Sequence, residues 1–515
     1  MKMITKIMKM KKFFCVFALF LAMAALMPAA AADAAASKIV FARPSDSDNL
    51  DPVTQSHNEN IWILNLMMDG LVKSSNEGTS IEPNLAKSWD VSGDGLEYTF
   101  HLVEGVKFSD GTPVTTADWV WSLLRARDEP TSIWGGNLKI ISDVSAPDDK
   151  TILVKLKQPD AAILASLAMF NASVLPKAYF EKVTLEGFTQ KPIGTGPFML
   201  KDWVKGEHLT LAKNPHYRVQ GIPQTDEIVF NVVPDNNTRT LQLEAGDIDG
   251  DLNALYNKMA ELKDNSAYVT ANFPGTLVRF LAFNTARKPF DDVRVRKAIA
   301  CAIDRKAILQ VALNGYGELG TAFMHKSLMY HNPDLPLEPL DVEKSKKLLA
   351  EAGVKGVTVE FLVRAGDNIA SQVGTIIQAN LAKVGITVKI VQMEAASVSS
   401  LQRSFQFDMI YSGWTSDMVD PAQAMERFIN YNDTTRCYYT GWKNDEAIKL
   451  VADALKELNP DKRREIYYKV QKIYADECPA VSLFYGGYPV ILRAGISGFV
   501  QTPLGNYRFE NLVKK

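Results

Sequence analysis

The chain has 515 residues, of which 47% are hydrophobic and 23% are charged, and its formal net charge is −2. This length is sufficient for two or three packed domains. A near-neutral charge without a basic stripe argues against a nucleic-acid partner.

The N-terminal segment has the pattern of a secretory signal peptide. It carries five lysines, Lys2, Lys6, Lys9, Lys11 and Lys12, and residues 13–27 form a continuous apolar run. Ala34-Ala35-Ala36 offers a cleavage site of small residues, so we expect residues 1–36 to be removed. A retained membrane anchor is the alternative, although the run is short for a span of about 20 residues. Cys15 stands at the start of the run rather than after it, which argues against a lipid-anchored protein.

Three cysteines follow residue 36: Cys301, Cys437 and Cys478. An odd number leaves at least one of them without a disulfide partner in the chain. An exported protein permits one disulfide, and the sequence does not choose the pair.

Short strands and helices alternate along the first half of the chain. Apolar patterns indicate strands over 39–41 and 152–156, and helices over 61–71 and 161–170. Mixed local structure of this kind excludes a purely helical or purely β fold.

Residues 98–126 contain a strand followed by a helix. Tyr98, Phe100 and Leu102 alternate with polar residues, which predicts a half-buried strand. Thr115 or Thr116 is placed to cap the helix that follows the Asp110-Gly111 turn.

Gly194 and Gly196 resemble part of a dinucleotide-binding fingerprint. The position of the third glycine holds Met199, and Pro197 prevents the required helix start. We therefore expect a strand-turn-strand here.

The second half repeats helices and strands in turn. Asp291 or Asp292 is placed to cap a helix that continues to residue 303. Helices are expected over 341–353, 373–383 and 461–477, and strands over 357–363 and 386–391. This alternation predicts an α/β lobe.

Three stretches of the chain resemble the signature of one family. Residues 85–126 read LAKSWDVSGDGLEYTFHLVEGVKFSDGTPVTTADWVWSLLRA, residues 193–198 read IGTGPF, and residues 283–299 read FNTARKPFDDVRVRKAI. They resemble family 5 of the extracellular solute-binding proteins, the peptide/nickel family. Its members are the ligand-capturing components of ABC importers.

The resemblance covers the mature chain and implies an α/β fold of two lobes, a type II periplasmic binding protein of the large peptide-binding class. It implies a first lobe over 37–283, completed by 490–515, with an extra subdomain over about 80–190. The second lobe would span 284–489. Two crossing segments would form the hinge, and the ligand would lie in the cleft between the lobes.

The segment 409–421, MIYSGWTSDMVDP, resembles the binding segment of the dipeptide- and oligopeptide-binding branch. The resemblance implies that Asp417 pairs with the α-ammonium group of a peptide. It also implies that Trp414 lines the pocket with its neighbours Gly413 and Thr415. Arg364 matches the position that binds the α-carboxylate. A carboxylate and a guanidinium group recognise both charged ends of a peptide, whatever its side chains.

Other contacts are expected from the first-lobe loop over 54–58, with Ser56 and His57, and from Tyr438. Structural roles compete with the binding roles. Asp417 could instead cap a turn before the helix near Pro421, Arg364 could be solvated, and Trp414 could belong to the core.

Other ligand classes of the family remain open: a nickel chelate, glutathione or an oligosaccharide. No His-x-x-x-His or Cys-x-x-Cys pair indicates a direct metal site. A periplasmic peptidase is the alternative from another class, but no Gly-x-Ser-x-Gly or His-Glu-x-x-His motif is present.

We therefore expect a monomeric periplasmic protein that works without a cofactor and is not an enzyme. It would capture short peptides, close over them and deliver them to an inner-membrane ABC permease with separate ATPase subunits.

Overall fold

The computed structural model describes residues 37–55, 57–132, 134–432 and 436–515. The predicted signal peptide lies outside the described residues. Residues 38–515 form one unit by their internal contacts. None of the helices in the described ranges combines the length and apolar character needed to cross a bilayer.

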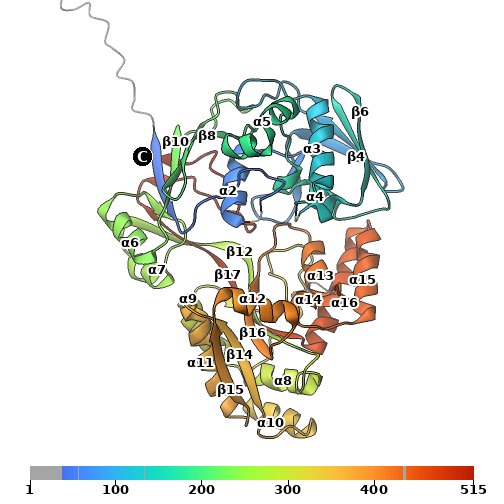
Figure 1. Ribbon diagram of the computed structural model, residues 1–515, viewed down its shortest axis with the longest axis vertical. Helices are drawn as coiled ribbons and strands as arrows, with labels where there is room; N and C mark the ends of the chain where they lie inside the picture. The colour runs from blue at the N-terminus through green and yellow to red at the C-terminus, as the bar shows by residue number, and fades with distance from the viewer. Residues whose placement is uncertain (1–36, 56, 133, 433–435) are drawn as a thin grey trace, which may run out of the picture. The chain divides into compact units, whose positions relative to one another are not determined.

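Eleven strands form a central sheet (Figure 1). Their order is β15-β14-β16-β12-β17-β11-β1-β10-β9-β8, and β13 pairs with β17. The strands are β1 (Lys38–Arg43), β8 (Phe198–Val204), β9 (His208–Lys213), β10 (Glu227–Val232), β11 (Gly250–Asp251), β12 (Tyr268–Phe283), β13 (Glu318–Leu319), β14 (Thr358–Arg364), β15 (Thr387–Met393), β16 (Met409–Trp414) and β17 (Ala480–Arg493).

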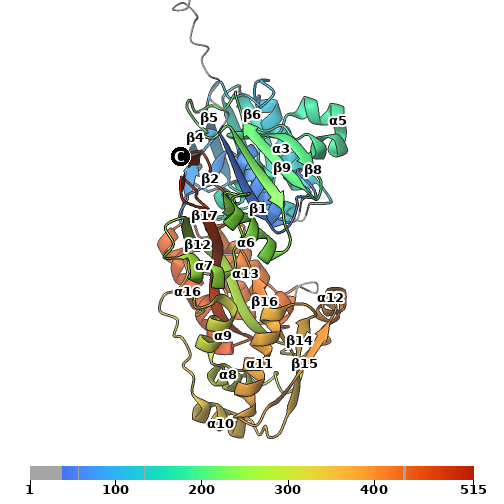
Figure 2. The same ribbon diagram turned by 90° about the vertical axis from the view of Figure 1, so that its left-hand side faces the viewer.

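The long strands β12 and β17 run antiparallel through the middle of this sheet and lie side by side in both views (Figures 1 and 2). Strands of the first half of the chain lie on one side of them, and β14, β15 and β16 lie on the other. They are the two crossing segments of a two-lobed fold. Their pairing shifts register between Pro274 and Val278.

The first lobe has two main hydrophobic cores. One packs α2 (Asn58–Met67) and α5 (Lys177–Gln190) against β1, β8, β9 and β10. The other packs α3 (Thr116–Asp128) and α4 (Ile163–Leu167) on a separate sheet of order β4-β5-β7-β6. That sheet comprises β4 (Ala86–Val91), β5 (Glu97–Leu102), β6 (Ile141–Asp148) and β7 (Thr151–Leu156).

Short elements complete this half and the C-terminus: β2 (Val72–Ser74), β3 (Ile81–Pro83), the 3-10 turns η1 (Gly135–Leu138) and η2 (Phe170–Ala172), α6 (Asn236–Ala245), α7 (Tyr256–Leu262), β18 (Ile496–Ser497) and β19 (Val513–Lys514).

Local predictions in this lobe are largely confirmed. Tyr98, Phe100 and Leu102 are buried on one face of β5. Thr115 caps α3, because its side chain accepts the Asp118 N–H while the Asp118 carboxylate accepts the Thr115 N–H. The helix expected over 161–170 is shorter, because α4 ends at Leu167 and a 3-10 turn follows.

Gly194 and Gly196 lie where the chain passes closely over the end of α2. The Gly196 N–H donates to the Met67 carbonyl at 2.8 Å. A β-carbon at Gly196 would lie 2.7 Å from the Leu66 carbonyl oxygen. The glycines therefore permit backbone packing. The element before them is α5, so the expected strand-turn-strand is wrong in its first strand.

The second lobe packs helices on both faces of β14, β15 and β16, as the α/β alternation predicted. One core contains α8 (Val293–Ala302), α9 (Arg305–Leu313), α10 (Val342–Glu351) and α11 (Asn368–Ala382). The other contains α12 (Ala395–Ser404), α13 (Ala422–Phe428), α15 (Asp445–Lys456) and α16 (Pro460–Glu477), with α14 (Arg436–Tyr439) beside it. Figure 2 shows α9 and α11 beside the strands.

The helix starts of this lobe agree with the sequence, with one difference. Asp292 caps α8 and Asp341 caps α10. Helix α11 begins at residue 368, five residues before the expected start, because the Asp367 side chain accepts the Ala370 N–H. The pattern of apolar residues alone did not reveal this cap.

Candidate ligand-binding site

Asp417 is a half-buried carboxylate without a cationic partner. Its backbone N–H donates to Gln423 Oε1 at 2.8 Å, and Gln423 Nε2 lies 3.4 Å from its Oδ2. It forms no ion pair with another described residue. Burial raises the pKa of Asp417 to about 6, and Gln423 and the charge of Arg427 offset only part of this effect.

Asp420, three residues later, is fully satisfied. It is buried, and Arg463 Nη2 donates to its Oδ1 at 2.8 Å. The same oxygen accepts the Ala422 N–H at the start of α13. The structural role that competed for Asp417 thus belongs to Asp420.

Trp414 ends β16 and is half-buried. Its ring packs against Tyr438 at 5.4 Å and Phe428 at 6.4 Å between centroids. The Arg427 guanidinium lies 5.3 Å from its centroid. One side of the indole therefore belongs to the second-lobe core, and the rest is accessible.

A cavity of about 210 Å³ lies beside this segment and is lined by both lobes. Its lining includes Arg43, Glu59, Trp62 and Tyr507 from the first lobe, Leu277 and Tyr488 from the crossing strands, and Thr415 from the second lobe. Tyr488 lines the cavity and lies close enough to Asp417 to be affected by its charge. Burial raises the pKa of its phenol, and the negative charge of Asp417 raises it further.

Arg364 is exposed at the end of β14, and its side chain forms no ion pair or hydrogen bond with another described residue. Strands β14 and β16 are parallel, with Phe361 beside Met409 and Leu362 beside Ile410. This register places Arg364 level with Ser412. Arg364 and Asp417 therefore lie at the same carboxyl edge of the sheet, where α/β proteins commonly bind ligands.

Tyr438 lies in a left-handed turn. Residues 436–439 all have positive φ, between 46° and 68°. This left-handed conformation costs about 1–2 kcal/mol for each residue that is not glycine. The turn brings the Tyr438 hydroxyl to the Gly413 carbonyl, to which it donates at 2.9 Å. Strain of this kind concentrates at functional sites.

The first-lobe predictions remain open. Ser56 lies outside the described residues. His57 precedes α2, and its exposed imidazole lies 3.7 Å from the Asp48 carboxylate. Glu59 and Trp62, on the first turns of α2, line the cavity.

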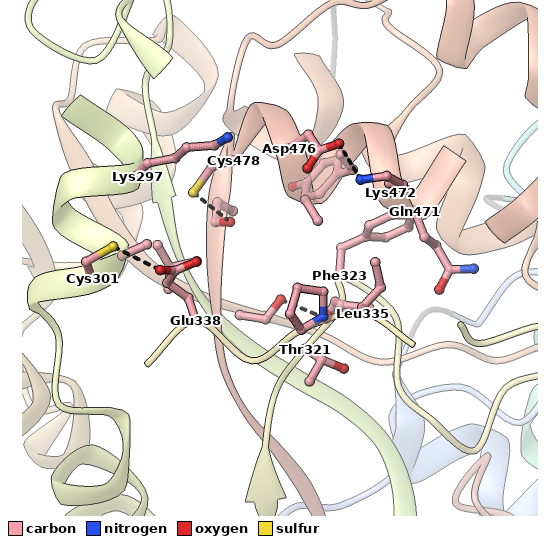
Figure 3. A pocket seen from close by; sticks show the side chains of 18 of the residues that line it. Lys297, Cys301, Thr321, Phe323, Leu335, Glu338, Gln471, Lys472, Asp476 and Cys478 are labelled. Carbon is pink, nitrogen blue, oxygen red and sulfur yellow. Dashed lines mark hydrogen bonds and ion pairs between the residues drawn. The ribbon is translucent and has the colours of Figure 1, made fainter. Parts of the chain in front are cut away.

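A larger cavity of about 540 Å³ lies within the second lobe (Figure 3). Its lining residues fall between 297 and 482, so the first lobe contributes nothing to it. Cys301 donates to the Glu338 carboxylate at 3.2 Å there, and burial raises the pKa of its thiol to about 12. An unreactive thiol in a one-lobed cavity does not match the geometry expected of the ligand site.

The described residues hold neither a disulfide nor a metal-ligand cluster. Cys301, Cys437 and Cys478 are free and buried. No group of three or more His, Cys, Asp or Glu in the described part of the chain is placed to hold a metal ion.

Sequence reasoning missed Tyr488 and Arg279. Arg279 stands in the apolar β12 run Val278–Phe283, next to Gly413 of β16. A cation within a buried strand is unusual, and that signal was available in the sequence.

The comparisons with known proteins identify the family. Residues 80–436 match the middle segment that defines the bacterial extracellular solute-binding proteins, family 5. The match covers more than half of the chain, and the chain belongs to this family. It is a binding protein of an extracellular class rather than an enzyme.

Relatives that are named for different ligands have nearly equal sequence identity to this chain. The chain is 30% identical to the dipeptide-binding protein of Escherichia coli (strain K12), covering 84% of this chain and 86% of the relative. It is 29% identical to heme-binding protein A of Haemophilus influenzae, covering 84% of each. It is 30% identical to the glutathione-binding protein GsiB of Escherichia coli O1:K1 / APEC, covering 93% and 94%.

Solved structures confirm the fold. DppA from Helicobacter pylori in complex with the peptide STSA has a TM-score of 0.78 and 29% identity, covering 93% of this chain and 98% of that one. NikA from Brucella suis in complex with Fe(III)-EDTA has a TM-score of 0.85 and 25% identity, covering 93% and 100%. The chain therefore has the α/β periplasmic binding protein fold of the large peptide-binding class. Identity at this level does not fix the ligand.

Proposed function

We propose that this chain is the periplasmic substrate-binding component of an ABC importer and that it captures short peptides. The observation that carries this proposal is Asp417. It is a half-buried carboxylate with a raised pKa, beside a cavity between the lobes and without a cation of its own. A peptide ammonium group would supply the missing charge.

Arg364 supports the same ligand class. Its guanidinium is unpaired at the sheet edge that also carries Asp417. A carboxylate and a guanidinium together complement a zwitterion. Heme and metal chelates, which related proteins bind, have no ammonium group to neutralise Asp417.

The remaining features of the proposal follow from the family. The predicted cleavage after residue 36 would release a monomer that is not lipid-anchored, and an ABC permease with separate ATPases would receive the peptide. We also propose lobe boundaries at 37–283 with 490–515, and at 284–489, because β12 and β17 end near them.

A thermal-shift screen tests the ligand class. Purified protein is heated with di-, tri- and pentapeptides, glutathione, oligosaccharides, heme, and nickel with and without histidine. At a hundredfold excess over Kd, a ligand that binds the folded state stabilises it by about 2.7 kcal/mol. Peptides should raise Tm. A shift with sugars, heme or metal chelates alone would exclude the peptide assignment.

The two anchors are tested by Asp417→Asn and Arg364→Ala. Each should weaken binding of a screened peptide by two to three orders of magnitude, because removing one member of a buried charge pair costs about 3–5 kcal/mol. Calorimetry measures Kd, and circular dichroism verifies folding. Asp420→Asn is the matched control. It breaks the pair with Arg463 and should lower Tm, whereas Asp417→Asn should not. Near-native affinity in both anchor variants would remove these residues from the site.

A further inference from the structure

Arg279 occupies a position that only a glycine neighbour permits. It faces Gly413 in the antiparallel pairing of β12 and β16. Its guanidinium lies over the α-carbon of that glycine, since a β-carbon at Gly413 would be 2.7 Å from Nη1 and 2.9 Å from Cδ. Gly413 therefore leaves room for a cation directly beside the Trp414–Asp417 segment.

The charge of Arg279 is not neutralised within the described part of the chain. Its Cζ lies 5.5 Å from the Tyr411 ring centroid, and its side chain forms no ion pair or hydrogen bond with another described residue. None of the guanidinium nitrogens of Arg279 is both buried and without a hydrogen-bond partner. Since the side chain has no partner, these nitrogens are accessible to solvent.

Three buried arginines of this fold have hydrogen-bond partners for their guanidinium groups. Arg239 donates to Asp251 at 2.8 Å, and Arg463 donates to Asp420. Arg296 donates to the carbonyls of residues 290, 477 and 478. Arg279 differs from these three arginines, although a half-buried cation gains stability from a partner.

The groups around Arg279 do not supply an anion. Burial raises the pKa of Tyr256 and of Tyr411 to about 12, and the positive charge of Arg279 opposes the rise in both. These phenols are therefore neutral at pH 7. The negative charge of Asp367 also raises the pKa of Tyr411. The Asp367 carboxylate accepts the Ala370 N–H as the cap of α11 and forms no ion pair with Arg279.

We propose that Arg279 binds a second carboxylate of the ligand, so that the site prefers short peptides with an acidic side chain. The inference rests on the proposed peptide-binding function. Arg279 lies two residues after Leu277 of β12 and faces Gly413, which lies two residues before Thr415; Leu277 and Thr415 both line the cavity between the lobes. Two guanidinium groups and one carboxylate complement a ligand with two carboxylates and one ammonium group.

Matched peptide pairs test this preference. Di- and tripeptides of alanine carry one glutamate at each position in turn, and each has a partner with glutamine there. The pair members have the same shape and differ by one charge. In calorimetry at low salt, the wild type should bind at least one glutamate peptide about tenfold more tightly than its glutamine partner.

Arg279→Met should remove this difference while leaving the affinity for glutamine peptides within about twofold, and Arg279→Lys should retain part of it. Arg294→Met is the control for loss of an arginine, since Arg294 pairs with Asp292 on the surface at α8. It should keep the full preference. Circular dichroism and Tm verify that the variants fold.

The outcomes separate the two proposals. Equal binding of glutamate and glutamine peptides by the wild type would overturn the inference and leave peptide binding intact. An equal loss for both peptides in Arg279→Met would also overturn it, because Arg279 would then hold the α-carboxylate. If no peptide binds the wild type, the peptide assignment fails and the inference fails with it.

Discussion

At the scale of single residues, Asp417 should make peptide affinity depend on pH. Its pKa is about 6 in the unliganded protein, and a peptide ammonium group would lower it. Below pH 6, binding must release the proton that the carboxylate has taken up. Kd should therefore rise about tenfold for each pH unit below 6 and stay constant above about pH 7.

Calorimetry across pH 4.5–8 measures this dependence. Asp417→Asn should bind weakly at every pH with a flat profile, because it has no proton to release. An unchanged slope in Asp417→Asn would assign the titration to another group.

The same residue should reduce the stability of the unliganded protein at neutral pH. The folded-state pKa of Asp417 is raised from 3.8 to about 6, so the folded state binds the proton more tightly than the unfolded state. The free energy of unfolding should therefore fall as pH rises from about 4 to about 6. Asp417→Asn should be more stable than the wild type by about 2–3 kcal/mol at pH 7.

Urea unfolding at several pH values measures that gain, which should shrink as pH approaches 4. A variant less stable than the wild type at pH 7 would show that Asp417 is satisfied without ligand.

At the scale of elements, the contact between α2 and the turn before β8 depends on glycine. A β-carbon at Gly196 would meet the backbone of residues 66 and 67, which cannot move without shifting α2. Gly196→Ala should cost about 1–3 kcal/mol in the free energy of unfolding. Gly93→Ala is the control, because a β-carbon at Gly93 meets nothing within 4 Å. Equal stability of the two variants would contradict the packing role.

At the scale of the whole molecule, the crossing strands are the place for a hinge. The β12–β17 pairing shifts register between Pro274 and Val278. The two strands approach closely there, because a β-carbon added at Gly275 would lie 3.0 Å from the Gly486 carbonyl oxygen. A ligand that contacts both lobes stabilises the conformation in which they are close. Saturating peptide should therefore reduce the radius of gyration in small-angle scattering. The radius of gyration of Asp417→Asn should not change at the same peptide concentration. A wild type that binds peptide without a decrease in its radius of gyration would exclude closure.

Much of the local structure could be predicted because it depends on neighbouring residues. The caps at Thr115, Asp292 and Asp341 were visible in the sequence, since each side chain bonds to an N–H two or three residues later. The alternation in β5 likewise identified its buried face. The start of α11 was missed because it depends on the Asp367 cap, which lies before the apolar pattern that indicated the helix over 373–383.

The candidate site could be predicted only in part. The family resemblance directed attention to Asp417, Trp414 and Arg364, and the parallel register of β14 and β16 brings the strand ends together. Arg279 precedes Asp417 by more than a hundred residues, and no local pattern connects the two.

The sequence by itself indicated the family, several helix caps and the buried faces of individual strands, because these depend on local bonding and periodicity. Only the tertiary structure decided which charges are satisfied. It pairs Asp420 with Arg463 across 43 positions and leaves Asp417, Arg364 and Arg279 without ion pairs among the described residues. The physical reason is that the desolvation and the pairing of a charge depend on side chains that come together only when distant strands join one sheet.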